Sequence, residues 1–148
     1  MNRKGHTIAG AISGTGVYCA DRLVRQKPIR PSQLIGAGVG GAIGGRIPDL
    51  LEPAKHSYHR SFFHGGSCAT LIGTLGLKAR DLSDKLDDMA QEITLKRCLS
   101  NNTLEKILLW IVAIVLAFLS GVIIGLFGGY LSHIVLDAST ARSVPLIA

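Results

Sequence analysis

The sequence has only three cysteines, and none of them stands at a spacing typical of a thiolate metal site. Cys19, Cys68 and Cys98 are far apart and lie in apolar or helical surroundings. We therefore expect buried small hydrophobic side chains, not disulfides or metal ligands. A phosphate-binding loop is also missing, because the glycine-rich run 38–44 has no preceding strand and no following lysine.

Charge is absent from residues 107–132, a run of 26 residues. As a helix, this run would be about 39 Å long, which exceeds the roughly 30 Å hydrocarbon core of a bilayer. The mean hydropathy of +0.35 is high for a soluble chain of this size. No clear cleavage site follows Asn2-Arg3-Lys4, so we expect the first apolar segment to be retained. These features predict an all-α integral membrane bundle in which residues 1–148 form one domain.

The net charge of +6 is distributed unlike that of a nucleic-acid-binding protein. Residues 78–106 hold six basic and six acidic side chains, and the basic excess lies between Arg3 and Arg60. Membrane lipid headgroups or an anionic substrate are the partners that this pattern favours, and nucleic acid is not.

The end of the bundle with the 22–30 link and residues 78–106 carries ten Lys and Arg, against six at the other end. The positive-inside rule then directs the second end away from the cytoplasm, which we take to be that of a bacterium with the protein in its inner membrane. Nothing in the sequence specifies an oligomeric state.

Proline and capping residues divide the chain into four expected helical segments. They are residues 7–23, 32–47, 65–77 and 103–139. Prolines interrupt the chain at positions 28, 31, 48 and 53, and Asn102 with Glu105 resembles a capping box at the start of the fourth segment. The first three segments are short for unassisted membrane spans.

Residues 78–96 continue the third segment as an amphipathic helix. Four apolar side chains recur there at spacings of three and four: Leu82, Leu86, Met89 and Ile93. We expect this extra helix to lie on the membrane surface or at the end of the bundle.

Glycine recurs every four residues in two of the segments. The two sets are Gly36, Gly40 and Gly44, and Gly121, Gly125 and Gly129. Such rows let helix backbones approach closely in lipid, so we interpret them as packing surfaces.

Histidine and aspartate gather at one end of the predicted bundle. Up-and-down threading brings His6, the histidines of the link between segments two and three, and His133 to the same side. Asp49 and Asp137 arrive there too, and Asp137 is four residues after His133 on one helix face. That pair suits two ligands of one metal, or a ligand with a carboxylate behind it. A lone histidine at a helix end is usually a cap or contact residue, but ionisable groups converging at a membrane face favour a metal site.

Three sequence elements resemble a family of membrane-bound metal-dependent hydrolases that includes a LexA-regulated inner-membrane member. The elements are Ile47-Pro48-Asp49-Leu50-Leu51-Glu52-Pro53, His59-Arg60-Ser61-Phe62-Phe63-His64 and Ser132-His133-Ile134-Val135-Leu136-Asp137. The chain departs from the family pattern at two points. Leu50 and Leu51 follow Asp49 where a second aspartate is common, and Gly65 follows His64 where serine is common.

The resemblance implies metal-activated hydrolysis of an ester or phosphoester. The expected ligands are His6, Asp49, His59, His64, His133 and Asp137, enough for one metal with supporting groups or for two metals. Imidazole and carboxylate without thiolate suit Zn²⁺, with Mn²⁺ or Fe²⁺ as alternatives. His56 or Glu52 would transfer protons, and Arg60 would bind an anionic group of the substrate or anchor a lipid headgroup. The position at the membrane surface favours an amphipathic or phosphorylated substrate.

Two other classes of function fit the same residues. One is a metal-ion transport or sensing protein, although residues 107–129 offer only Ser120 as a polar group in the membrane. The other is a structural or regulatory membrane protein, for which replacing His59 or His64 would change stability alone.

Overall fold

The computed structural model describes residues 3–51 and 66–138, and every regular element in these ranges is a helix. The helices are α1 (Arg3–Val24), α2 (Pro31–Gly44), α3 (Ile47–Leu51), α4 (Gly66–Leu99) and α5 (Thr103–Ala138). The prediction of an all-α chain is confirmed for this part of the protein. Four of these helices are long, and α3 is a single short helix of five residues.

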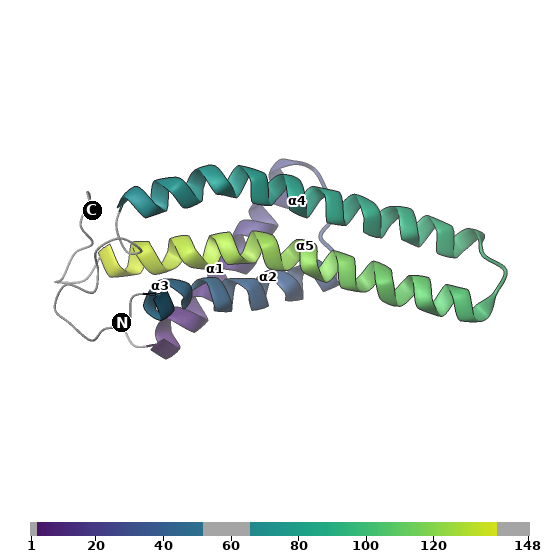
Figure 1. Ribbon diagram of the computed structural model, residues 1–148, viewed down its shortest axis with the longest axis horizontal. Coiled ribbons are helices and arrows are strands. Elements are labelled where there is room, and N and C mark those ends of the chain that lie inside the picture. The colour runs from purple at the N-terminus through teal and green to yellow at the C-terminus, as the bar shows by residue number, and fades with distance from the viewer. Residues whose placement is uncertain (1–2, 52–65, 139–148) are drawn as a thin grey trace.

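Helix α5 is the centre of the arrangement, because α1, α2 and α4 all pack against it. Helices α1 and α2 also pack against each other and cover the C-terminal half of α5. Helix α4 runs antiparallel to α5 along its length. The hairpin of α4 and α5 therefore extends well beyond α1 and α2 at one end of the molecule (Figure 1).

The two glycine rows pack α2 and α5 against each other as parallel helices. A Cβ atom added at Gly36, Gly40 or Gly44 would overlap the α5 backbone, and one added at Gly121, Gly125 or Gly129 would overlap the α2 backbone. Gly10 and Gly14 of α1 make the same close approach to α2. The interpretation of the glycines as a packing surface is confirmed, since each row replaces side chains with backbone contact.

The end of α2 differs from the expected one. The helix ends at Gly44, not at Ile47, and a new short helix, α3, begins at Ile47. Pro48 lies in the first turn of α3, where its missing N–H is not needed for helical hydrogen bonding. Asp49, expected in a loop, is therefore held on a helix.

The expectation that residues 78–96 continue the third segment as a helix is confirmed, but they do not form an extra helix at the end of the bundle. These residues belong to the continuous helix α4, which stays packed along α5. The predicted apolar face is also not the buried one, since Leu82 and Met89 are each about half exposed. Ser83, Asp87 and Ala90 are buried instead. Ser83 hydrogen-bonds Ser120 of α5, and the small side chains of Ala113 and Ala117 on α5 are buried as well.

Helix α5 begins and ends close to the expected positions. Asn102 accepts hydrogen bonds at Oδ1 from the backbone N–H groups of Leu104 and Glu105, which caps the helix. The Glu105 carboxylate accepts a hydrogen bond from Ser100, at 2.6 Å, and does not close the capping box on Asn102. Within residues 3–51 and 66–138, α5 alone is long and apolar enough to cross a membrane, with a mean hydropathy of 3.0.

The cysteines differ from the expectation of burial. Cys19 is half-buried, Cys98 is exposed, and both are free thiols. Cys98 lies in the last turn of α4. The side chain of Cys68 lies outside the described part of the chain.

A layer of ion pairs closes the bundle at the level where α1 and α2 are joined. The carboxylate of Asp87 on α4 forms ion pairs with the guanidinium groups of Arg22 and Arg30, each with an N–O distance of 3.0 Å. The Asp87 residue is 1% exposed. Asp84, one turn earlier, pairs with Arg25 and Lys27 at 2.8 and 2.9 Å. These contacts hold the end of α1 and the link between α1 and α2 against α4, and Asp21 of α1 also pairs with Arg80 of α4.

Candidate metal centre

Three buried side chains from the two ends of the chain meet beside the C-terminal half of α5. His133 and Asp137 lie one turn apart on α5, and His6 comes from the first two turns of α1. Their exposed fractions are 0%, 1% and 2%. Helix α1 runs antiparallel to α5, and its glycines allow the close approach that brings His6 to this level. The predicted convergence of these three residues is confirmed.

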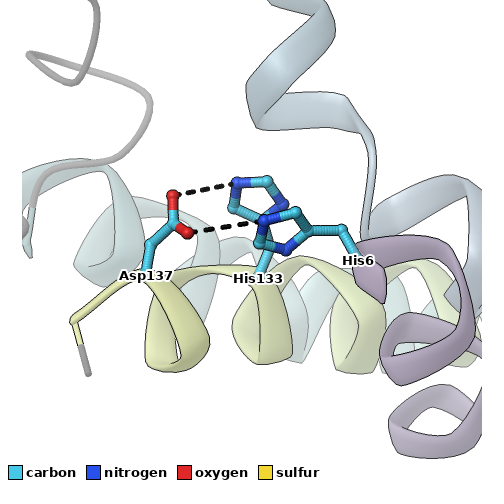
Figure 2. A group of neighbouring side chains, drawn as sticks. All are labelled: His6, His133 and Asp137. Atoms are coloured by element: carbon cyan, nitrogen blue, oxygen red, sulfur yellow. Dashed lines mark ion pairs between the residues drawn. The ribbon is translucent and has the colours of Figure 1, made fainter. Parts of the chain in front are cut away.

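The carboxylate of Asp137 lies beside the two imidazole rings, with one oxygen facing each of them (Figure 2). Its Oδ1 is 3.4 Å from Nε2 of His6, and its Oδ2 is 3.5 Å from Nε2 of His133. The two rings are stacked, with centroids 3.9 Å apart. Each residue offers one ligand atom such that all three atoms lie within 4.8 Å of one another.

The orientation of His133 is set by the end of α2. Its Nδ1 lies 2.7 Å from the carbonyl oxygen of Gly45. Because a carbonyl only accepts hydrogen bonds, Nδ1 donates, and in the neutral ring Nε2 carries the lone pair. A histidine that ligates a metal through one nitrogen typically donates its other N–H to such a group. The lone pair therefore faces Asp137.

Asp49 approaches from α3 on the side facing His133. Its Oδ1 is 3.7 Å from Nε2 of His133, and its side chain is 29% exposed. The predicted proximity of Asp49 to His133 is confirmed. Asp49 thus stands between the buried group and the surface of the protein.

The donor set fits a divalent metal ion. Ligand atoms at the usual zinc distances lie about 3.4 Å apart in a tetrahedral site, longer than a hydrogen bond between charged groups. The two imidazoles lie 3.4 and 3.5 Å from different oxygens of Asp137, and one ligand atom from each of the three residues lies within 4.8 Å of the others. Among the described residues, Nδ1 of His6 is buried and has no hydrogen-bond partner. The buried group of His6, His133 and Asp137 could therefore hold a metal ion, whose identity the geometry does not select.

A groove of about 410 Å³ opens beside this group. It is lined from α1, α2 and α3, and its polar wall includes Asp49 and Arg46. Its volume is within the range of small-molecule sites. Asp49 lines the groove and lies 3.7 Å from His133, so it connects the groove to the buried group.

Five predicted site residues lie outside the described residues. They are Glu52, His56, His59, Arg60 and His64. They all belong to the segment that links α3, which carries Asp49, to α4.

Two positions were missed in the sequence. The Gly45 carbonyl orients His133, and the signal available was the Gly44-Gly45 pair at the end of the glycine row. Arg46 lines the groove, and it precedes the Ile47-Pro48-Asp49 element directly. Neither signal was distinctive, because a backbone acceptor has no side-chain signature and an exposed arginine is common at membrane surfaces.

Comparison with models of known protein families, with characterised proteins and with solved structures finds no match to this chain. Its function is therefore inferred from the chemistry of the site.

Proposed function

We propose that this protein is a membrane-bound metal-dependent hydrolase. The observation that carries the proposal is the buried group of two imidazoles and a carboxylate with ligand atoms at metal-like separations. His6, His133 and Asp137 would hold the ion, with Asp49 as a further ligand. Zn²⁺ suits this donor set, with Mn²⁺ or Fe²⁺ as alternatives. A divalent ion there supplies Lewis-acid activation of water and of an ester or phosphoester.

The residues around the group have separable roles in this proposal. The Gly45 carbonyl holds His133 in the tautomer that directs Nε2 inward. Arg46, on the wall of the groove, would bind an anionic group of the substrate next to Asp49. Glu52 or His56 would transfer the proton to the leaving group, and Arg60 would add a second cation. The similarity of the three sequence elements to metal-dependent hydrolases supports this assignment.

Helix α5 supports the membrane part of the proposal. Its most apolar window is only 22% buried, unlike the core helix of a soluble protein. Leu108, Ile111 and Val115 are each about half exposed in its N-terminal half. Charged residues of α4 run beside that half, so lipid would reach α5 from the side opposite α4. An amphipathic ester or phosphoester is the substrate class that such a position favours.

The test is the metal content of the purified protein in detergent. We expect stoichiometric zinc, manganese or iron by elemental analysis, and loss of at least tenfold in affinity in the His133→Ala and Asp137→Asn variants. Ser132→Ala is the matched control, since Ser132 is adjacent but hydrogen-bonds only Gly129 among the described residues. Circular dichroism establishes that each variant is folded.

Hydrolysis is then measured over phosphoester and lipid-ester substrates. Metal with turnover that the Asp137→Asn variant loses would support the hydrolase. Absence of metal from a folded wild-type protein, after incubation with each of the three ions, would refute the proposal and favour a structural or regulatory membrane protein. Stoichiometric metal without turnover of any substrate would favour transport or sensing.

A further inference from the structure

A second groove lies at the other end of the molecule, where α4 and α5 project beyond α1 and the start of α2. Its volume is about 490 Å³. It lies about 24 Å from the candidate metal centre, since Ala117 and His133 are sixteen residues apart on α5. A molecule bound there cannot reach His133, so the groove needs a separate explanation.

The groove follows the boundary between a polar and an apolar helix. Its floor is formed by small buried side chains, Ala90, Ala113 and Ala117. On the α4 side the wall combines Gln91 and Thr94 with the apolar Leu95, and on the α5 side it is apolar, with Trp110 and Ile114. Trp110 is 49% exposed and Ile114 is 39% exposed. A ligand that fills this groove must itself have a polar and an apolar part.

The charge of the groove has one sign. Arg30 and Arg97 line it, and a smaller groove of about 300 Å³ continues from it past Arg97 and Trp110 to Lys106. None of the residues lining either groove is acidic. Arg30 shares Asp87 with Arg22, so this trio keeps one net positive charge. Arg97 pairs with no carboxylate in the described ranges. The polar part of the ligand should therefore be an anion.

We propose that this groove binds an anionic phospholipid, with the phosphate at Arg97 and an acyl chain along Trp110 and Ile114. Arginine binds phosphate through two parallel hydrogen bonds, and a tryptophan at a polar–apolar boundary is typical of sites at the lipid interface. Charge complementarity separates this ligand from a zwitterionic lipid, and the apolar wall separates it from free phosphate. The inference is independent of the chemistry at the metal centre.

The chain has a single tryptophan, so the fluorescence of Trp110 reports on this groove directly. The experiment titrates the full-length protein in mild detergent with dihexanoyl phosphatidylglycerol below its micelle concentration. Dihexanoyl phosphatidylcholine and glycerol 3-phosphate are titrated in parallel. We expect saturable binding of phosphatidylglycerol, at least tenfold tighter than that of phosphatidylcholine, and no saturable signal from glycerol 3-phosphate.

Arg97→Gln should reduce the affinity for phosphatidylglycerol about tenfold, whereas Arg97→Lys should retain most of it. The matched control is Lys96→Gln, which removes the same charge one residue earlier, at a side chain that is 62% exposed, pairs with Glu92 and does not line the groove. Equal affinity for the two lipids, or equal losses in Arg97→Gln and Lys96→Gln, would overturn the proposal. Binding of glycerol 3-phosphate as tight as that of the lipid would also overturn it, in favour of a plain phosphate site.

Discussion

Asp87 is the acidic side chain on which the charged end of the bundle depends. It is almost fully buried and accepts hydrogen bonds or ion pairs from Arg22 and Arg30. Arg22 is itself only 4% exposed. A buried ion pair adds little net stability over an apolar replacement, but removing one partner leaves an uncompensated charge.

The Asp87→Ala variant should therefore lose about 3–5 kcal/mol of stability, because Arg22 cannot reach water in the folded bundle. Thermal unfolding in detergent, followed by circular dichroism, measures the loss. The neighbouring Asp88→Ala variant is the control, since Asp88 is exposed and its replacement should change stability by no more than about 0.5 kcal/mol. Equal losses in the two variants would mean that Asp87 is not the buried counter-charge described here.

At the level of single residues, the sequence predicts much of the candidate site. The spacing of His133 and Asp137 places them on one helix face, and the threading of the chain brings His6 and Asp49 to the same end. The sequence does not predict the tautomer of His133, because it depends on where α2 ends and exposes the Gly45 carbonyl. That end is set by packing, not by a local signal.

Among the helices, the pairing of α2 with α5 depends most directly on residue size. The two glycine rows interlock, so that backbone oxygens of one helix fill the positions that Cβ atoms would occupy on the other. A Cβ atom at Gly125 would overlap the carbonyl oxygen of Ala37, and neither backbone can move without separating the helices.

Gly125→Val should destabilise the protein by about 1–3 kcal/mol or more, since the new side chain meets backbone and not a flexible side chain. Gly16→Ala is the matched control, because a Cβ atom there meets nothing within 4 Å. This second variant should be neutral or stabilised by up to about 1 kcal/mol, the usual gain of alanine over glycine in a helix. The midpoints of thermal unfolding, compared in one detergent, test both; a Gly125→Val protein as stable as wild type would contradict the interlocked packing.

The helices themselves were predictable to different extents. The ends of α5 follow from the capping residue Asn102 and from the long uncharged run. Helix α4 was misjudged because its apolar residues suggested a membrane-facing surface. The side of α4 that is buried is instead the one with polar partners. Ser83 hydrogen-bonds the Ser120 hydroxyl of α5, and Asp87 pairs with the guanidinium groups of Arg22 and Arg30. Such choices depend on partners distant in the sequence.

Across the whole molecule, the two ends differ in chemistry. One end holds the buried histidines, and the other holds ion pairs that join α4 to the α1–α2 link. Burial alone would raise the pKa of Asp84, but the hydrogen bonds from Arg25 and Lys27 outweigh it and lower the pKa below its ordinary value.

This lowered pKa gives the stability of the protein a dependence on acid pH. The folded protein favours the ionised form of Asp84, so its contribution is fully present above the unfolded pKa of about 4 and is lost as the pH falls through the lower, folded value. Unfolding midpoints between pH 6 and pH 3 should therefore fall less steeply in Asp84→Asn than in wild type. Asp88→Asn, exposed and one turn away, should keep the wild-type slope; an Asp84→Asn slope identical to wild type would exclude this contribution.

The dependence of α4 on α5 has a consequence for how the chain assembles. Among the described residues, α4 packs along α5 and contacts α1 through ion pairs of Asp21 and Arg22, yet α4 precedes α5 in the sequence. During synthesis, α1 and α2 can pair through their glycines as soon as both have emerged, whereas α4 must wait for α5. The N-terminal and C-terminal helical hairpins are then two local units that fold quickly because their contacts are near in sequence. His6 and His133 belong to different hairpins, so the candidate site is complete only when the two hairpins are packed together.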